Sequence, residues 1–343
     1  MTRVACIDIG TVTARLAVAD VEGGRVVRLA KRSEICNLGQ DVDATGRLHQ
    51  DAMERVFACA GSYVEEARKA GATSACCTLT SAARDAENSW ELGAALASLG
   101  LEPMVIPGEV EGALTFLGVA QDFRGHRILV ADNGGGSTEL ALGSLREDGV
   151  LDLEFVRSVD VGCRRVSEKC LSHDPLPTAD DLLAAHAFAG ERFAPAVEEG
   201  GLCAAGEGAP ERLVVTGGTV TTLVAVEKAL VPYDSSQVHL ARLSREKIDG
   251  LEARLASMPV GERAELPGIQ AKRAPVILGG AVAVGELMDR TGFSELTVSE
   301  SDLLFGLSLA AAAALERRDS PVIWKPEMRP LGGAGSDTAG ASE

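Results

Sequence analysis

Apolar and polar residues follow one another along this chain in patterns that predict alternating strands and helices. Residues 4–9, 13–20 and 24–32 are predicted as three strands in a meander, and the last of them follows a turn at Gly23–Gly24. Apolar residues then recur at helical spacing from Asp51 until Gly71. The next segments are predicted as strand, helix, strand and helix, at residues 75–79, 81–99, 103–106 and 109–120. The first part of the chain therefore has the predicted order β-β-β-α-β-α-β-α.

The second part of the chain begins with a predicted hairpin at residues 128–143 and a third strand at residues 153–161. A long helix is expected at residues 178–199, because its first residue, a threonine, suits an N-cap and two aspartates follow in the first turn. The other expected elements are helices at 164–171, 244–257 and 274–289 and strands at 213–216 and 296–298. The last helix, at residues 300–317, is apolar on most of its circumference and must be buried. Residues 329–343 are rich in glycine, alanine and serine, so we expect disorder there.

The hairpin at residues 128–143 contains an unusual turn. Its first apolar stretch ends in Asp132, three glycines come shortly after, and Ser137, Thr138 and Glu139 lead into the second apolar stretch. Successive glycine N–H groups can converge on an anion, and the carboxylates at the two ends of the turn are hard oxygen ligands. The turn therefore indicates a phosphate site with Mg²⁺, in which Asp132 and Glu139 are the metal ligands. For an isolated turn of this composition, a plain hairpin with two solvated acids is the more common outcome.

Two further segments repeat the pattern of an apolar strand, a glycine turn and hydroxyl side chains. Near the N-terminus, an apolar strand ends in Asp8 and Gly10 and is followed by threonines. The strand at residues 213–216 leads through Gly217 and Gly218 into a predicted helix, and helix N-termini bind phosphate through free N–H groups. The chain thus has three expected backbone cradles for phosphate. Their predicted phosphate-binding residues are Thr11, Thr13, Gly134, Gly135, Gly136, Ser137, Gly218 and Thr219.

Composition and charge limit the class of protein. The 343 residues are 46% hydrophobic and 24% charged, which is typical of a globular chain with room for two domains. No apolar stretch approaches the roughly 20 residues that span a bilayer. The N-terminus lacks a signal-peptide pattern, so we expect a cytoplasmic location. The eight cysteines lack metal-ligand spacing and are expected to be small buried hydrophobes. The formal net charge of −17 argues against nucleic-acid binding, which requires a basic face.

Five ordered motifs make the chain similar to a known family. The motifs are DIGTVTARL (8–16), TSAARDAEN (80–88), PGEVEGALTFLGV (107–119), DNGGGSTELALG (132–143) and TGGTVTTL (216–223). In this order and spacing they resemble the exopolyphosphatase / guanosine pentaphosphate phosphohydrolase (Ppx/GppA) family, over nearly the whole chain. The resemblance implies an α/β fold of two actin/Hsp70/sugar-kinase-like (ribonuclease H-like) domains around a central phosphate-binding cleft. It also implies a short form of the family, because longer members carry an additional all-helical C-terminal domain.

The resemblance assigns domains, activity and partners to the chain. The first domain is expected at residues 1–124 together with a returning helix at 300–320, and the second domain at residues 125–299. The implied activity is Mg²⁺-dependent release of terminal orthophosphate from inorganic polyphosphate or guanosine pentaphosphate, with guanosine tetraphosphate as a related ligand. Because the negative charge of the chain opposes a long polyanion, short polyphosphates are expected unless a local basic cleft and metal ions overcome the repulsion. Family members are often dimers, so a homodimer is a further expectation.

The resemblance also assigns roles to individual residues. Glu111 matches the catalytic glutamate that polarises the attacking water, although an acid in the first turn of a helix also favours the helix dipole. Arg84 matches the arginine that contacts phosphate in the family. Asp8 is expected to join the two acids of the glycine turn at the metal, with capping of a tight turn as its alternative role. Arg15 and Arg165 are weaker candidates for the cleft.

The chain departs from the family pattern at several positions. Val12 replaces a usual asparagine, and Asn133 stands where an aliphatic residue is usual. Val110 and Ala113 replace an acid and a base beside Glu111. One alternative hypothesis is therefore a catalytically weak protein that binds polyphosphate or an alarmone. Another is an ATP-dependent kinase of the same fold group, which the phosphatase-type motifs disfavour.

Overall fold

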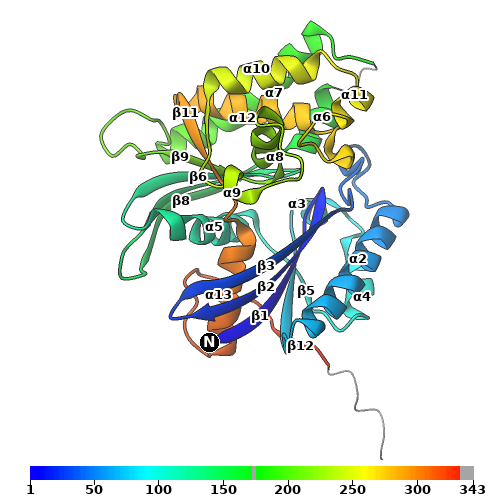
Figure 1. The fold of residues 1–343 in the computed structure, drawn as a ribbon, viewed down its shortest axis with the longest axis vertical. Coiled ribbons are helices and arrows are strands. Elements are labelled where there is room, and N and C mark those ends of the chain that lie inside the picture. The colour runs from blue at the N-terminus through cyan, green and yellow to red at the C-terminus, as the bar shows by residue number, and fades with distance from the viewer. Residues whose placement is uncertain (172–174, 333–343) are drawn as a thin grey trace, which may run out of the picture.

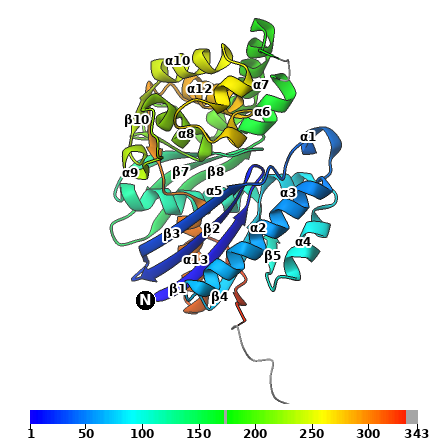
Figure 2. The same cartoon turned by 45° about the vertical axis from the view of Figure 1, so that its right-hand side comes forward.

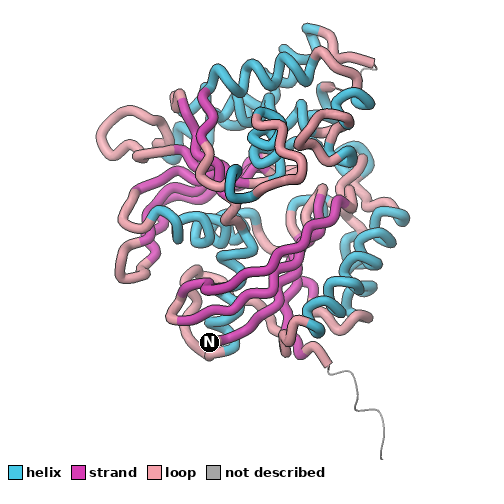
Figure 3. The backbone as a smooth tube through the Cα atoms, in the orientation of Figure 1, coloured by secondary structure: helices cyan, strands magenta, loops and turns pink. Residues whose placement is uncertain are grey.

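Two six-stranded β-sheets form the frame of the protein, and helices cover both of them (Figures 1 and 3). The computed structural model describes residues 1–171 and 175–332. We call the first sheet with its outer helices the first lobe, and the second sheet with its outer helices the second lobe. In the described part of the chain, no helix combines the length and the hydrophobicity needed to cross a membrane.

The first sheet is built from the N-terminal part of the chain. Its strands are β1 (Thr2–Ile9), β2 (Thr13–Glu22), β3 (Arg25–Ile35), β4 (Ser74–Leu79), β5 (Pro103–Val105) and β12 (Arg329–Pro330). The order is β12-β4-β1-β2-β3, with β5 beside β4. The first three strands form an antiparallel meander, and β4 runs parallel to β1. The outer helices are α1 (Val42–Thr45), α2 (Gln50–Lys69), α3 (Ser81–Asp85) and α4 (Ser89–Ala97), of which Figure 2 shows α2 and α4 side by side.

The second sheet repeats this arrangement in the order β10-β11-β9-β6-β7-β8. Its strands are β6 (Arg127–Asn133), β7 (Thr138–Leu145), β8 (Leu151–Val159), β9 (Leu213–Thr216), β10 (Arg242–Ser244) and β11 (Glu295–Ser299). β6 to β8 form an antiparallel meander, and β9 runs parallel to β6. The helices of this lobe are α6 (Cys163–Cys170), α7 (Ala179–Gly200), α8 (Gly218–Glu227), α9 (Ser235–Val238), α10 (Arg245–Ala256), α11 (Val260–Ala264) and α12 (Ile277–Thr291). Short 3-10 helices occupy Ala120–Phe123 and Ala271–Arg273.

Two helices, α5 (Gly108–Val119) and α13 (Leu303–Leu315), join the lobes between the sheets. α5 packs on β7 and β8 of the second sheet, and α13 packs on β1 and β2 of the first sheet. The two helices cross closely, since a Cβ atom added to Gly306 of α13 would lie 1.8 Å from the carbonyl oxygen of Leu114 in α5. The prediction that the last helix is buried is therefore confirmed, and this helix lies against β1 and β2 of the first sheet.

Most predicted elements are present within a few residues of their expected bounds, and Thr178 caps α7 as expected by accepting a hydrogen bond from the N–H of Asp181. The single helix predicted at residues 81–99 is wrong, because the chain forms α3 and α4 with a break between them. At the break, the amide of Asn88 bonds to both backbone groups of Leu48, at 2.8 and 3.1 Å. This contact replaces helical hydrogen bonds with tertiary ones.

The C-terminal tail differs in part from the expected disorder. Arg329 and Pro330 form β12, which pairs with β4 in antiparallel fashion. The prediction of disorder is therefore wrong for these two residues. The rest of the predicted tail from residue 333 onward lies outside the described residues.

Candidate functional site

A small cavity lies where the turns that follow β1, β6 and β9 come together between the two lobes. Its volume is about 60 Å³, and its lining includes Thr11 and Thr13 of the first lobe and Gly217 and Gly218 of the second. The glycine turn and Glu111 complete the wall. The structure thus brings together the three strand and glycine units that the sequence predicts. Of the predicted phosphate-binding residues, those that line the cavity are Thr11, Thr13, Gly134, Gly135, Gly136, Ser137 and Gly218.

Thr219 is the predicted phosphate-binding residue that the structure places elsewhere. Its side chain is 1% exposed and lies against Gly280 of α12, where an added Cβ atom would be 2.5 Å from the Thr219 methyl group. The threonine therefore packs the start of α8 onto α12 instead of facing the cavity.

The carbonyl groups of the glycine turn point toward α6. The backbone N–H of Cys163 donates to the carbonyl of Gly134, and the N–H of Arg164 donates to that of Gly135, both at 2.9 Å. In a trans peptide, the N–H that follows a carbonyl points in the opposite direction. Because the carbonyls of the turn face α6, the N–H groups that follow them face away from it. This is the arrangement that a backbone nest for an anion requires.

Glu111 and Arg84 form an ion pair at the edge of the cavity. The distance from the Arg84 guanidinium to the Glu111 carboxylate is 2.7 Å. The same guanidinium lies 3.4 Å from the hydroxyl of Ser137 and 3.6 Å from the carboxylate of Glu139. Glu111 is 7% exposed, and burial raises its pKa well above the ordinary value, aided by the charge of Glu139 and opposed by Arg84. A carboxylate with a raised pKa is a better proton acceptor than an exposed one.

Asp132 and Glu139 face each other across the glycine hairpin, because β6 and β7 pair these two residues directly. Glu139 accepts hydrogen bonds from the hydroxyls of Ser137 and Ser158, both at 2.7 Å. Burial, followed by the charge of Asp132, raises the pKa of Glu139 to about 7. Asp132 accepts a bond from Thr115 at 3.1 Å, and burial raises its pKa to about 6.

The Asp8 carboxylate has two partners inside the protein, Arg15 and Thr78. It is fully buried, lies 2.7 Å from the guanidinium of Arg15 and accepts a hydrogen bond from Thr78 at 3.0 Å. Over residues 1–171 and 175–332, no three acidic, histidine or cysteine side chains gather in the arrangement of a preformed metal site. The three predicted metal ligands therefore do not form such a group, although Asp132 and Glu139 stay close to each other.

Arg273 is a cavity residue that the sequence did not reveal. It ends the 3-10 helix Ala271–Arg273, and its guanidinium lies over Gly218, where an added Cβ atom would be 2.3 Å away. Burial lowers the pKa of Arg273, and none of the ion pairs among the described residues includes it. A buried guanidinium without a carboxylate partner is suited to an anionic ligand. No motif includes this arginine, so only its position after folding identifies it.

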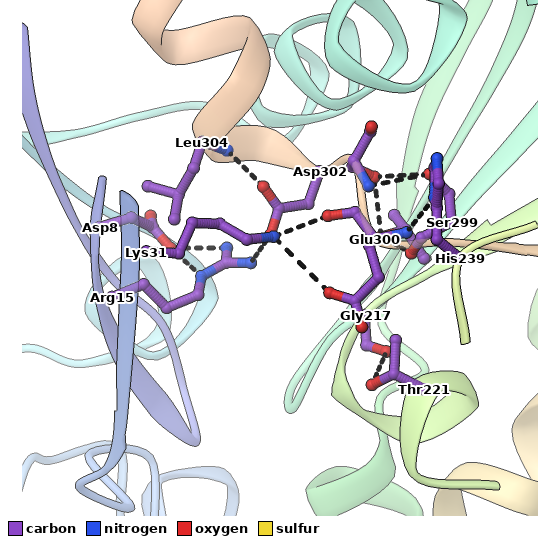
Figure 4. Close-up of polar contacts among 12 residues, drawn as sticks. Asp8, Arg15, Lys31, Gly217, Thr221, His239, Ser299, Glu300, Asp302 and Leu304 are labelled. Atoms are coloured by element: carbon purple, nitrogen blue, oxygen red, sulfur yellow. Dashed lines mark hydrogen bonds and ion pairs between the residues drawn. The ribbon is translucent and has the colours of Figure 1, made fainter. Parts of the chain in front are cut away.

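A second, larger cavity of about 390 Å³ adjoins the first, and Arg15 and Arg273 line both. Figure 4 shows Arg15 and Lys31 reaching from the first sheet toward Glu300 and Asp302, which lie between β11 and α13. Lys31 donates to the backbone carbonyl of Glu300 at 2.7 Å and lies 3.4 Å from the Asp302 carboxylate. The lining of the larger cavity also contains apolar and aromatic residues, namely Leu230, Val231, Pro232, Tyr233 and Ile269.

Comparisons with known proteins show the family of the chain. The model of the Ppx/GppA phosphatase family matches residues 17–309. Exopolyphosphatase 2 of Mycobacterium tuberculosis is 36% identical over 330 residues, which cover 91% of this chain and 99% of that protein.

Solved structures give the same result. The crystal structure of an exopolyphosphatase-like protein is 31% identical with a TM-score of 0.80, over 90% of this chain and 97% of that one. A Ppx/GppA family member from Aquifex aeolicus is 28% identical with a TM-score of 0.74, over 93% and 99% of the two chains. The predicted fold class of two actin-like α/β domains is confirmed by this similarity.

Proposed function

Because the chain belongs to the Ppx/GppA phosphatase family, it is a phosphoanhydride hydrolase, and we propose that it releases terminal orthophosphate from short inorganic polyphosphate or guanosine pentaphosphate. The observation that carries this proposal is the pair of Glu111 and Arg84 beside the glycine turn, with a guanidinium-to-carboxylate distance of 2.7 Å. A base, a cation and a row of N–H groups at one small cavity are what phosphoryl transfer to water requires.

Different residues of the cavity have different roles in the proposed reaction. Glu111 orients the attacking water and accepts its proton, for which its raised pKa suits it. Arg84 and Arg273 offset the negative charge of the phosphoryl oxygens. The N–H groups of the glycine turn and the hydroxyls of Thr11 and Thr13 hold the terminal phosphate. Asp8 acts through Arg15, which it fixes in place at 2.7 Å.

A divalent cation fits the acids of the glycine turn. Asp132 and Glu139 are both buried, and burial, together with the charges of neighbouring acids, raises their pKa values to about 6 and 7. Mg²⁺ is commonly held by one or two carboxylates together with substrate phosphates, so two acids suffice. We propose that these two residues hold it. When bound, the cation supplies charge neutralisation at the phosphoryl oxygens.

The larger cavity favours the nucleotide among the two substrates. This cavity of about 390 Å³ adjoins the phosphate cavity at Arg15 and Arg273, and its wall includes Tyr233 and Ile269. Apolar and aromatic surface beside arginines suits a nucleoside that carries phosphates. Short polyphosphate would use only the basic part of this wall.

The test measures phosphate release from a short polyphosphate, a long polyphosphate and guanosine pentaphosphate, each with Mg²⁺ and each with a chelator. We expect release from the short chain or the nucleotide, and loss of release with the chelator. If no substrate releases phosphate with any divalent cation, the hydrolase proposal fails. Binding without release would instead support the alarmone- or polyphosphate-binding alternative.

Several finer assignments belong to the same proposal. We place the first domain at residues 1–124 and 300–320 and the second at 125–299, which limited proteolysis within residues 120–128 and 298–302 can test. A homodimer and a cytoplasmic location complete it. Light scattering of the purified protein tests the first, and cell fractionation tests the second.

A further inference from the structure

The three carbonyl groups of the glycine turn are held by two different kinds of donor. Backbone N–H groups of α6 bind the carbonyls of Gly134 and Gly135. The third carbonyl, that of Gly136, accepts instead from the side chain of Arg165, whose Nε lies 2.7 Å away. A substitution of Arg165 leaves the two backbone hydrogen bonds in place but removes the hydrogen bond to the Gly136 carbonyl. One peptide of the turn therefore depends on one side chain.

The peptide group that Arg165 holds joins Gly136 to Ser137, so it carries the N–H of Ser137. Because this N–H is antiparallel to the Gly136 carbonyl, it points away from Arg165. Among the described residues, the Ser137 N–H donates no hydrogen bond, and Ser137 lines the phosphate cavity. Arg165 thus sets the direction of a free donor at the place where phosphate is expected.

The same guanidinium also reaches the other lobe. Arg165 donates to the carboxylate of Asp85 in α3 at 2.5 Å and to that of Asp43 in α1. Its side chain is 11% exposed. Asp85 directly follows Arg84, whose contacts with Ser137 and Glu139 also cross between the lobes. One planar group therefore ties the glycine turn of the second lobe to the helix that carries Arg84 in the first.

We propose that Arg165 is a positioning residue for hydrolysis. It fixes the Ser137 N–H of the second lobe and Arg84 of the first lobe in their positions relative to each other, and this inference rests on the proposed hydrolase function. Its guanidinium donors are turned toward Gly136, Asp43 and Asp85, so it does not bind substrate itself. The expectation of Arg165 as a cleft residue is therefore replaced by an indirect role. Lysine cannot replace it, because an ammonium group lacks the planar fork that serves acceptors in separate directions.

The test compares Arg165→Lys, Arg165→Met and Asp85→Asn with wild type, in the substrate assay described above. Lys169→Met is the matched control, because Lys169 lies on the same helix and also pairs with Asp43, yet within the described part of the chain its side chain makes no hydrogen bond to the glycine turn. We expect both Arg165 variants to lower kcat on the order of 10²-fold, the cost of one misdirected oxyanion donor, with a smaller change in KM. Lys169→Met should stay near wild type.

The double variant Arg165→Met with Asp85→Asn separates positioning from general weakening. We expect it to lose no more activity than Arg165→Met alone, because both changes break one linkage. Thermal midpoints of all variants are measured in parallel. A threefold or smaller loss of kcat in folded Arg165→Met would overturn the inference, as would full activity of Arg165→Lys. If Arg165→Met does not fold, the kcat of Arg165→Lys decides the matter alone. An inactive wild type would refute the hydrolase function itself, which is a separate outcome.

Discussion

Replacement of Glu111 by glutamine should abolish most phosphate release while leaving the protein folded. The glutamine keeps the shape of the side chain and an oxygen that can accept from Arg84, which lies 2.7 Å from the native carboxylate. It removes a buried negative charge that Glu139 repels. We therefore expect the thermal midpoint of Glu111→Gln to equal or exceed that of wild type.

The expected loss follows from the role of the carboxylate. A positioned general base typically contributes about 10²- to 10⁴-fold to the rate, which corresponds to about 3 to 5 kcal/mol at about 1.4 kcal/mol per factor of ten. The loss should appear in kcat, because the phosphate contacts of the glycine turn and Arg273 remain. Initial rates of orthophosphate release at varied substrate and fixed Mg²⁺ measure it.

Glu109→Gln provides the matched control. Glu109 lies in the first turn of the same helix, carries the same charge and is exposed. Its loss should cost no more than the interaction of an acid with a helix N-terminus, about 0.3 to 1 kcal/mol of stability, and leave kcat near wild type. Glu111 is not the general base if Glu111→Gln keeps more than a tenth of the wild-type kcat, or if both variants lose activity equally.

Three further predictions concern binding, packing and pH. Arg273→Met should lower kcat/KM about 10- to 100-fold, the worth of a charge-assisted hydrogen bond; initial rates that match wild type would show that Arg273 only packs the fold. Gly306→Ala should destabilise the protein by about 1 to 3 kcal/mol, because the new methyl would lie 1.8 Å from the Leu114 carbonyl oxygen; urea unfolding measures this, and a neutral result would mean that α5 and α13 separate freely. His186 lies between glutamates of α10 and α12, and a hydrogen bond to the α10 glutamate is the main cause that raises its pKa from 6.5 to about 9. Its stabilising contribution should be complete below about pH 6.5 and lost as the pH rises to about 9, so the pH dependence of the thermal midpoint over this range should flatten in His186→Gln, and an unchanged profile would argue against this role.

The sequence alone accounts for the elements and for the backbone part of the site. Glycines between apolar strands predicted the turn at Gly134 to Gly136, and in the structure this turn lines the cavity. This succeeded because such a turn depends on local conformational freedom, which neighbouring residues determine. The roles of Glu111 and Arg84 came from the ordered motifs, not from periodicity, and the structure places the two side chains in contact.

Tertiary packing decided which partner each charged side chain has. Arg165 was a weak cleft candidate in the sequence, but it binds Gly136 and acids more than 70 positions away. Asn88 broke a predicted helix by bonding to Leu48, 40 residues earlier. Arg273 belongs to no sequence motif, and it lines the cavity because the fold places its guanidinium against Gly218 at the start of α8. Local patterns specify strands, helices and turns because those depend on nearby residues, whereas the burial and pairing of a charge depend on segments that meet only in the folded chain.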